Sequence, residues 1–262
     1  MDNKTNKYAV ITFLFNHYDL LREPLVIDED IDYYCLTDDA NITSETWKCI
    51  YISEFDTNDL TGIQKTYMSK YSFYKYIPTH YEYFICIDAS IEIKGNISEI
   101  LDYYNNNNNI DFGIAVHPFR IRYIDEYREW IRSRGLNNVY LEMFEKYCKD
   151  NNISSSDFSG LLECTVKLFK NTKQITDFID NVYKTLLKYC NFADANDQCY
   201  FTNEFRKYDD KLKVGFFYRQ LLTGSRYFNK YYHKTHTFNH GSNDKNRTNK
   251  IIFGNERKIL EF

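Results

Sequence analysis

The chain has 262 residues, of which 43% are hydrophobic, 27% charged and 18% aromatic, and its formal net charge is −4. This length suits one large domain with a single core. The charge disfavours a general nucleic-acid binder, which needs a concentrated excess of Lys and Arg. We find no apolar run of about 20 residues that could span a membrane and no secretory leader in the polar start at 1–7, so we expect a soluble protein.

The seven cysteines are odd in number and widely spread, and no two have Cys-x-x-Cys spacing. This pattern favours reduced, mostly buried thiols over disulfides or a zinc site. A reducing compartment is expected, and the predicted location is the cytoplasm.

The predicted elements alternate along the chain. Apolar runs rich in β-branched and aromatic residues predict strands at 8–15, 32–37 and 47–52, followed by a helix at 66–76 and a buried strand at 83–87. Next come a helix at 97–104, a strand at 112–116, helices at 124–134 and 141–148, a return to the sheet at 160–169, an amphipathic helix at 175–187 and a helix at 197–205. This order predicts an α/β fold with a mostly parallel, helix-covered sheet, whose ligands bind beyond the carboxyl ends of the strands.

A single carboxylate follows the most apolar of these strands. The segment ICIDASIEI places Asp88, Ala89 and Ser90 directly after the strand at 83–87. Oxygen ligands of this kind can hold Mn²⁺ or Mg²⁺, and such a cation offsets the charge of a leaving diphosphate. An alternative interpretation is that Asp88 only caps the next turn.

His117 and Arg120 follow the strand at 112–116 and are therefore expected at the same edge of the sheet. His117 could orient an acceptor hydroxyl, and Arg120 could bind a phosphate or an acidic sugar. A structural role for His117 is the alternative.

Six short segments occur in an order and spacing typical of one family. They are NHYDLLREP (16–24), DYYCLTDD (32–39), WK (47–48), YIP (76–78), DASIEIKG (88–95) and HPFR (117–120). Over roughly 8–205 the chain resembles the glycosyltransferase-like family of plant mucilage and turgor-regulation proteins and their bacterial and viral homologues. The chain departs from the usual Asp-x-Asp motif, because Ser90 stands where a second Asp is expected.

The resemblance implies a GT-A-type fold with a Rossmann-like nucleotide-binding half. It implies one domain over 1–262, with a nucleotide-sugar-binding half at about 1–116, an acceptor half at about 117–224 and a basic tail at 225–262. The tail could close over a diphosphate as a lid or touch an anionic membrane surface, or it is a solvated basic end.

The resemblance also implies which side chains bind the nucleotide-sugar donor. Thr12, Phe13 and Tyr18 would flank the base, and Asp38 would lie near the uridine or ribose. Core packing is the alternative for the aromatic rings. Lys65 and Lys70 would face the phosphates, and Asp88, Ala89, Ser90, Arg120 and Gln198 complete the expected donor-binding set.

Three further residues are expected on the acceptor side or at the metal. Glu163 resembles the Glu of a family Gly-Leu-x-Glu segment. Asp197, in a segment similar to the family's Arg-Asp-Gln but with Asn196 in place of Arg, would contact donor-sugar hydroxyls or act as a base, or it is an ordinary helix-capping residue. His240 would complete a metal site with Asp88 and Ser90, or it belongs to a helical face without chemistry.

The predicted function is therefore a metal-dependent, hexosyltransferase-type glycosyltransferase that moves a sugar from a nucleotide-sugar donor, with a UDP-sugar favoured, to a glycan, protein or lipid-linked hydroxyl acceptor. A retaining and an inverting route remain open, and Asp197 or Glu163 would be the base of an inverting one. The alternative is a non-catalytic nucleotide- or carbohydrate-binding module of the same fold.

Overall fold

Nine strands of the described part of the chain pair into two sheets in the computed structural model, which describes residues 6–17, 19–53, 60, 62–117, 120, 122–136, 138–154, 160–189, 196–217 and 228–230. Seven strands form one sheet in the order β3-β2-β1-β4-β7-β6-β8, and two form a small pair, β5-β9. Their bounds are β1 Tyr8–Leu14, β2 Ile31–Thr37, β3 Lys48–Tyr51, β4 Tyr83–Asp88, β5 Ile91–Ile93, β6 Phe112–Val116, β7 Leu162–Lys170, β8 Val214–Phe217 and β9 Phe228–Lys230.

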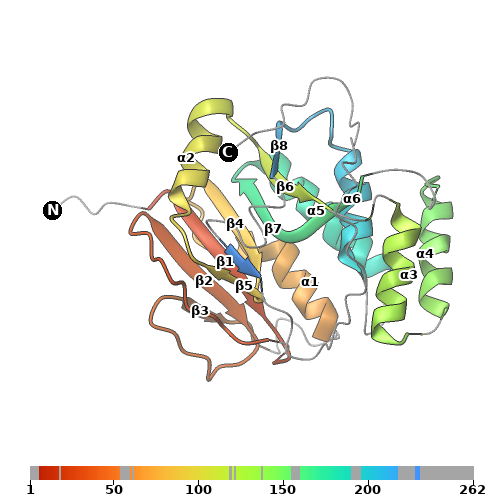
Figure 1. Ribbon diagram of the computed structural model, residues 1–262, viewed down its shortest axis with the longest axis horizontal. Helices are drawn as coiled ribbons and strands as arrows, with labels where there is room; N and C mark the ends of the chain where they lie inside the picture. Colours follow the sequence, from red (N-terminus) through yellow and green to blue (C-terminus); the bar gives the residue numbers. More distant parts are fainter. Residues whose placement is uncertain are drawn as a thin grey trace.

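Strand directions make this sheet mostly parallel. The strands β3, β2, β1 and β4 run parallel to one another, β7 is antiparallel to both β4 and β6, and β8 is parallel to β6. The predicted α/β class with a mostly parallel sheet is therefore confirmed (Figure 1).

Helices cover the two faces of the sheet unequally. Their bounds are α1 Gly62–Ser72, α2 Ser98–Asn108, α3 Tyr123–Arg134, α4 Val139–Asp150, α5 Lys173–Tyr189 and α6 Asp197–Arg206, with a 3-10 turn at Phe73–Lys75.

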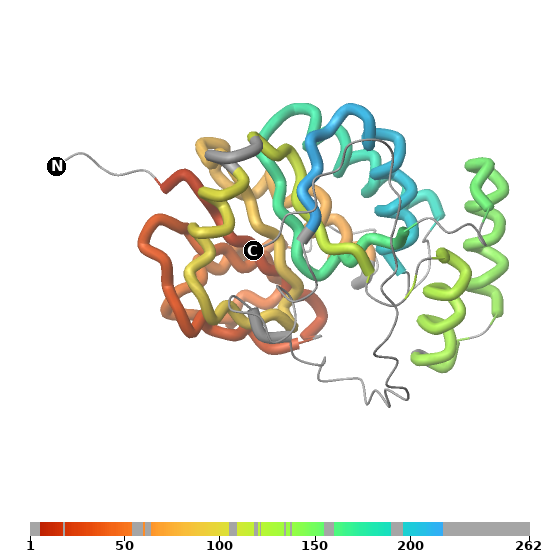
Figure 2. Tube along the Cα trace, turned by 45° about the horizontal axis from the view of Figure 1, so that its top comes forward, coloured from red at the N-terminus to blue at the C-terminus, as the bar shows by residue number. Residues whose placement is uncertain are grey.

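Side chains of β1 alternate between two cores: Ala9, Ile11 and Phe13 pack with α1, α5 and α6, whereas Val10 and Leu14 pack with α2. This period of two is expected of a strand that is buried on both faces. The α3–α4 pair lies at the side of the molecule away from β3 (Figure 2).

Each predicted strand and helix corresponds to an observed one, with differences at the ends. Helix α1 begins at Gly62, four residues before the predicted range, and α2 continues to Asn108. The short strands β5, β8 and β9 were not predicted, since runs of three or four residues carry little periodic signal.

The strand order changes direction beside β1. The chain moves outward from β1 to β2 and β3, and then returns to β4 on the other side of β1. In open α/β sheets the crevice for a ligand lies at such a switch point, beyond the carboxyl ends of the strands. The register pairs Phe13 of β1 with Asp88 of β4 at this edge, so the fold brings the predicted metal ligand to the switch point.

Candidate functional site at the carboxyl edge of the sheet

Asp88 is the last residue of β4 and lies between the buried strand and the solvent. Its side chain keeps 28% of its surface exposed. Alternation along β4 directs Asp88 to the same side as Phe84 and Cys86, which pack in the core that includes α1. The carboxylate is thus aimed at α1 and is still within reach of a ligand.

Lys70, in the last turn of α1, joins Asp88 to a second carboxylate. Its Nζ lies 2.9 Å from Asp88 Oδ1 and 3.1 Å from Asp197 Oδ2, and the Lys70 side chain is only 10% exposed. Burial by itself lowers the pKa of this ammonium, but attraction by Asp197 and Asp88 outweighs burial and raises the pKa above its ordinary value. Lys70 therefore stays charged and holds the two aspartates together.

Asp197 is the first residue of α6, and Asn196 before it is the N-cap, whose side chain accepts a hydrogen bond from the Gln198 N–H at 3.1 Å. Tyr71 donates its hydroxyl to Asp197 Oδ2 at 2.7 Å. Burial would raise the pKa of Asp197, yet the charges of Lys70 and Lys167 and the Tyr71 hydrogen bond together lower it. Asp197 is thus a carboxylate stabilised in its charged form, and the capping role falls to Asn196.

A second lysine, Lys167 of β7, lies near the same group and is fully buried. Its Nζ donates to the Cys164 carbonyl at 2.7 Å and lies 5.5 Å from the centre of the Tyr71 ring. Between Ile114 and Ala115 of β6 the β7 partner jumps from Lys167 to Glu163, so β7 bulges at this edge. Burial, and after it the charge of Lys70, lower the pKa of Lys167.

Three predicted donor-site residues carry a buried oxygen that has no hydrogen-bond partner within the described part of the chain. They are Thr12 Oγ1, Ser90 Oγ and Gln198 Oε1. Buried polar atoms without partners are rare in folded proteins, and each one calls for an explanation such as a ligand, an ion or a water molecule. All three belong to residues at or beside the carboxyl edge of the sheet.

The other described residues of the predicted nucleotide-binding set lie on or beside β1, β2, β4 and α1. Phe13 is buried in the core, and Asp38 accepts a hydrogen bond from the Asn16 N–H at 3.0 Å, which ties the end of β2 to the end of β1. The carbonyl of Ala89 accepts a hydrogen bond from Arg22 Nη1 at 2.7 Å. Lys65 is half-buried on α1, one turn before Lys70. Tyr18 lies outside the described residues.

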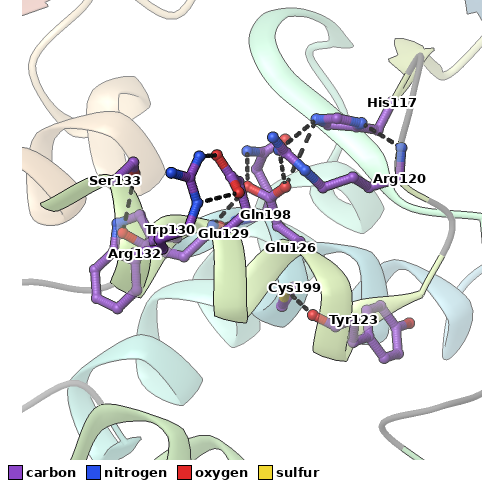
Figure 3. A network of polar contacts seen from close by, with 11 residues as sticks. His117, Arg120, Tyr123, Glu126, Glu129, Trp130, Arg132, Ser133, Gln198 and Cys199 are labelled. Atoms are coloured by element: carbon purple, nitrogen blue, oxygen red, sulfur yellow. Dashed lines mark hydrogen bonds and ion pairs between the residues drawn. The ribbon is translucent and has the colours of Figure 1, made fainter. Parts of the chain in front are cut away.

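His117 and Arg120 belong to a second network, centred on Glu126 of α3 (Figure 3). Arg120 Nη1 donates to Glu126 Oε2, and His117 Nε2 lies 3.7 Å from the same oxygen. Glu126 Oε1 accepts from Asn196 Nδ2 at 2.8 Å and from Gln198 Nε2 at 3.3 Å. His117 and Arg120 therefore face the beginning of α6.

Glu163 is buried at the start of β7, where Thr165 donates its hydroxyl to Glu163 Oε1 at 2.8 Å.

Among the described residues, no three His, Cys, Asp or Glu side chains come together as a metal site. His240 lies outside the described residues, as does the predicted basic tail at 225–262 except for 228–230. No helix of the described chain is both long enough and apolar enough to cross a bilayer.

Three residues of these networks were not predicted from the sequence: Tyr71, Glu126 and Lys167. Each lies inside a predicted strand or helix, where its spacing is that of an ordinary core or surface position. A charged residue within an apolar run was the one available signal, and Lys167 in LECTVKLF shows it. Burial of a charge normally requires a partner, so such a residue points to a polar group opposite.

Comparison with known proteins leaves the family open. No family model matches the chain, and no curated protein matches it. Among solved structures, mouse xyloside xylosyltransferase 1 in its apo form is similar, with 13% identity and a TM-score of 0.43 over 80% of this chain and 84% of that chain. At this identity and TM-score the likeness identifies neither a family nor a substrate, and the resemblance to the plant family stays a prediction.

Proposed function

We propose that this protein is a metal-dependent glycosyltransferase of the GT-A type, which moves a sugar from a UDP-sugar to a hydroxyl acceptor. One observation carries the proposal: Lys70 joins Asp88, at the switch point of the sheet, to Asp197, at the start of α6. The sheet edge that ordinarily receives a nucleotide is therefore linked to the helix that the sequence resemblance assigns to the donor sugar.

The described residues fit a hard divalent cation that shares its ligands with a diphosphate. Asp88 offers a carboxylate that is partly exposed, and Ser90 offers a buried hydroxyl oxygen to which no described residue is hydrogen-bonded. Mg²⁺ is commonly held by one or two carboxylates together with substrate phosphates, so this partial set of oxygen ligands suffices. When bound, Mn²⁺ or Mg²⁺ would supply positive charge for the departing diphosphate. Asp88 and Ser90 would hold the cation, and His240 remains a proposed third ligand.

Lys70 has the position and charge to assist the same leaving group. It is buried, permanently charged and close to Asp88, so a diphosphate bound at Asp88 would meet a preorganised ammonium group. Lys167 of β7 adds a second positive charge, which acts on Asp197. The chain thus provides an electrostatic environment that favours a developing negative charge.

Asp197 suits sugar binding better than proton abstraction. An effective general base has a pKa near the working pH, whereas the pKa of Asp197 is lowered by its two lysine neighbours. A carboxylate in that state is a strong hydrogen-bond acceptor for the hydroxyl groups of a sugar. We therefore assign Asp197 to the donor sugar, and leave Glu163 as the candidate base for an inverting route.

The donor nucleoside would bind where β1 and β2 end, beside Thr12, Phe13 and Asp38. Thr12 Oγ1 is buried and has no partner among the residues that the structure describes, and Asp38 already joins the ends of the two strands. The acceptor would be a glycan, protein or lipid-linked hydroxyl on the side of His117 and Arg120. A reducing location, the cytoplasm, is proposed from the cysteine pattern.

Release of UDP from UDP-sugars tests this function. The purified chain is incubated with UDP-glucose, UDP-galactose or UDP-N-acetylglucosamine in the presence of Mn²⁺ or Mg²⁺, and free UDP is measured over time. We expect Asp88→Ala to reduce the release by about 100-fold or more, as loss of a preorganised charge at a leaving group does.

Asp32→Asn is the matched control, because Asp32 also pairs with a lysine but lies at the amino end of β2. This variant should release UDP at the wild-type rate. Tight UDP binding without turnover would instead identify a non-catalytic binding module, and equal rates for Asp88→Ala and the wild type would contradict the proposed role of Asp88.

A further inference from the structure

Glu126 is a buried carboxylate to which the proposed function gives no role. It is 4% exposed and receives donors from two separate segments, one after β6 and one at the start of α6. Figure 3 shows the side chains of His117, Arg120 and Gln198 converging on it from these segments. A buried charge with this many partners is held in one position, and it holds its partners in turn.

The two oxygens of Glu126 serve different partners. Oε2 accepts from Arg120 Nη1, while Oε1 accepts from Asn196 Nδ2 at 2.8 Å and from Gln198 Nε2 at 3.3 Å. An ionised carboxylate only accepts hydrogen bonds, so both amides must present their NH₂ groups to it. The side-chain orientations of Asn196 and Gln198 are therefore set by Glu126.

This orientation has opposite consequences for the two amides. The oxygen of Asn196 turns back to the helix and accepts the Gln198 N–H at 3.1 Å. The oxygen of Gln198 is directed away from Glu126 and is buried without a hydrogen-bond partner among the described residues. Gln198 follows Asp197, which pairs with Lys70, at the start of α6, and its unfilled acceptor is a position that a ligand hydroxyl can satisfy.

The ring of His117 is fixed by the same network. The backbone N–H of Arg120 donates a hydrogen bond to His117 Nδ1 at 3.0 Å, so a neutral His117 carries its proton on Nε2. This Nε2 atom lies 3.7 Å from Glu126 Oε2. Arg120 and His117 thus both support the carboxylate from the side opposite Gln198.

We propose that Glu126 is a positioning residue, which fixes the Gln198 amide so that its oxygen accepts a hydroxyl of the donor sugar. This inference rests on the proposed function, because a sugar is the ligand whose hydroxyl would fill the acceptor. Glu126 itself does not touch the ligand and acts through Gln198.

The Glu126→Gln variant reverses this arrangement with almost no change of shape. Arg120 requires an oxygen, so the new NH₂ group of residue 126 must face the amides of Asn196 and Gln198. Gln198 would then turn its oxygen toward residue 126 and present NH₂ to the ligand. The sugar hydroxyl then loses its hydrogen-bond acceptor, whereas the UDP part of the donor loses no hydrogen bond.

The experiment compares the affinities for UDP and for UDP-sugars by calorimetry in the presence of Mn²⁺, using UDP-glucose, UDP-galactose and UDP-N-acetylglucosamine as probes. We expect Glu126→Gln to weaken the tightest UDP-sugar by about 10-fold, the effect of one lost hydrogen bond, and to leave UDP binding unchanged. Glu129→Gln is the matched control, since Glu129 lies one turn along the same helix and pairs with Arg132, whose side chain is 70% exposed. It should change neither affinity.

A double-mutant cycle with Gln198→Ala tests whether Glu126 acts through Gln198. Gln198→Ala should cause the same loss, and Glu126→Gln should add nothing on that background. Gln198→Ala also keeps the proposal testable if Glu126→Gln does not fold, and an unchanged UDP-sugar affinity in Gln198→Ala would then overturn it. Equal weakening of UDP and UDP-sugars by Glu126→Gln, or no weakening, would overturn the positioning role alone. A folded wild-type chain that binds no nucleotide would overturn the proposed function instead.

Discussion

Two clusters with the same chemistry lie at opposite edges of the sheet. At the amino edge, Asp32 accepts from Lys48 Nζ at 2.6 Å and from the Tyr81 hydroxyl at 2.6 Å. At the carboxyl edge, Asp197 pairs with Lys70 at 3.1 Å and accepts from the Tyr71 hydroxyl at 2.7 Å. Each cluster thus joins an aspartate, a lysine and a tyrosine.

The clusters differ in the surroundings of the lysine. Lys48 has a side chain that is 57% exposed and pairs with one carboxylate, whereas Lys70 is 10% exposed and pairs with two. The direction of the strands adds the second difference, because parallel strands direct ligands to their carboxyl ends. An Asp, Lys and Tyr cluster is therefore not a site in itself, and its position in the sheet and its burial distinguish a candidate site from a surface ion pair.

Removal of the lysines should give the largest difference in stability between the clusters. Lys70→Met leaves Asp88 and Asp197 without their shared counter-ion, and we expect a loss of about 3 kcal/mol in the free energy of unfolding. This loss is at the lower end of the range expected when one partner of a buried ion pair is removed, because Asp88 is partly exposed to water. Lys48→Met should cost less than about 1 kcal/mol, as exposed ion pairs do.

Urea denaturation of the two lysine variants measures this difference. The Lys75→Met variant is a further control, since Lys75 follows the same helix and lies 3.9 Å from Asp180 with a side chain that is 54% exposed. A loss in Lys70→Met no greater than that in Lys48→Met would show that Lys70 is not a buried counter-ion.

Removal of the tyrosine hydroxyls should have a smaller effect. Tyr71→Phe deletes a buried hydrogen bond to a charged group, and we expect a loss of about 2 kcal/mol. Tyr81→Phe should cost about 1 kcal/mol, because Asp32 keeps its bond to the exposed Lys48 and is itself partly exposed to water. Thermal and urea unfolding of both variants provide the measurement, and a larger loss in Tyr81→Phe would contradict the order.

Acid should weaken both clusters in the same direction. The pKa of Asp32 is lowered because bonds from Lys48 and Tyr81 outweigh burial, and the pKa of Asp197 is lowered by its lysines and Tyr71 against burial. A lowered folded-state pKa means that the stability is fully present above the ordinary value of 3.8 and is lost as the pH falls through the folded-state pKa.

The Asp→Asn variants measure each contribution to this acid dependence. Below about pH 4 the free energy of unfolding should fall less steeply with decreasing pH in Asp197→Asn and in Asp32→Asn than in the wild type. The change should be greater for Asp197→Asn, because Asp197 is the more enclosed of the two, with 14% exposure against 19%. Wild-type steepness in Asp197→Asn would contradict a lowered pKa of that carboxyl.

The order of the elements and the position of Asp88 follow from local patterns in the sequence. Apolar runs and helical spacing are local signals, and a polar residue directly after a buried run marks the end of a strand. These signals placed β1, β4 and β6 to within about one residue and brought Asp88 and His117 to one edge of the sheet.

The pairing of the charged residues depends on how distant segments pack together in the fold. Lys70 and Asp197 form an ion pair although they are 127 positions apart in the sequence, and Glu126 and Gln198 form a hydrogen bond although they are 72 positions apart. Such pairing depends on the packing of α1, α3 and α6 into one core, and local sequence patterns do not predict this packing. Because buried charges require partners that the chain can supply from any distance, a sequence shows which residues carry charge but the fold decides which of them form a site.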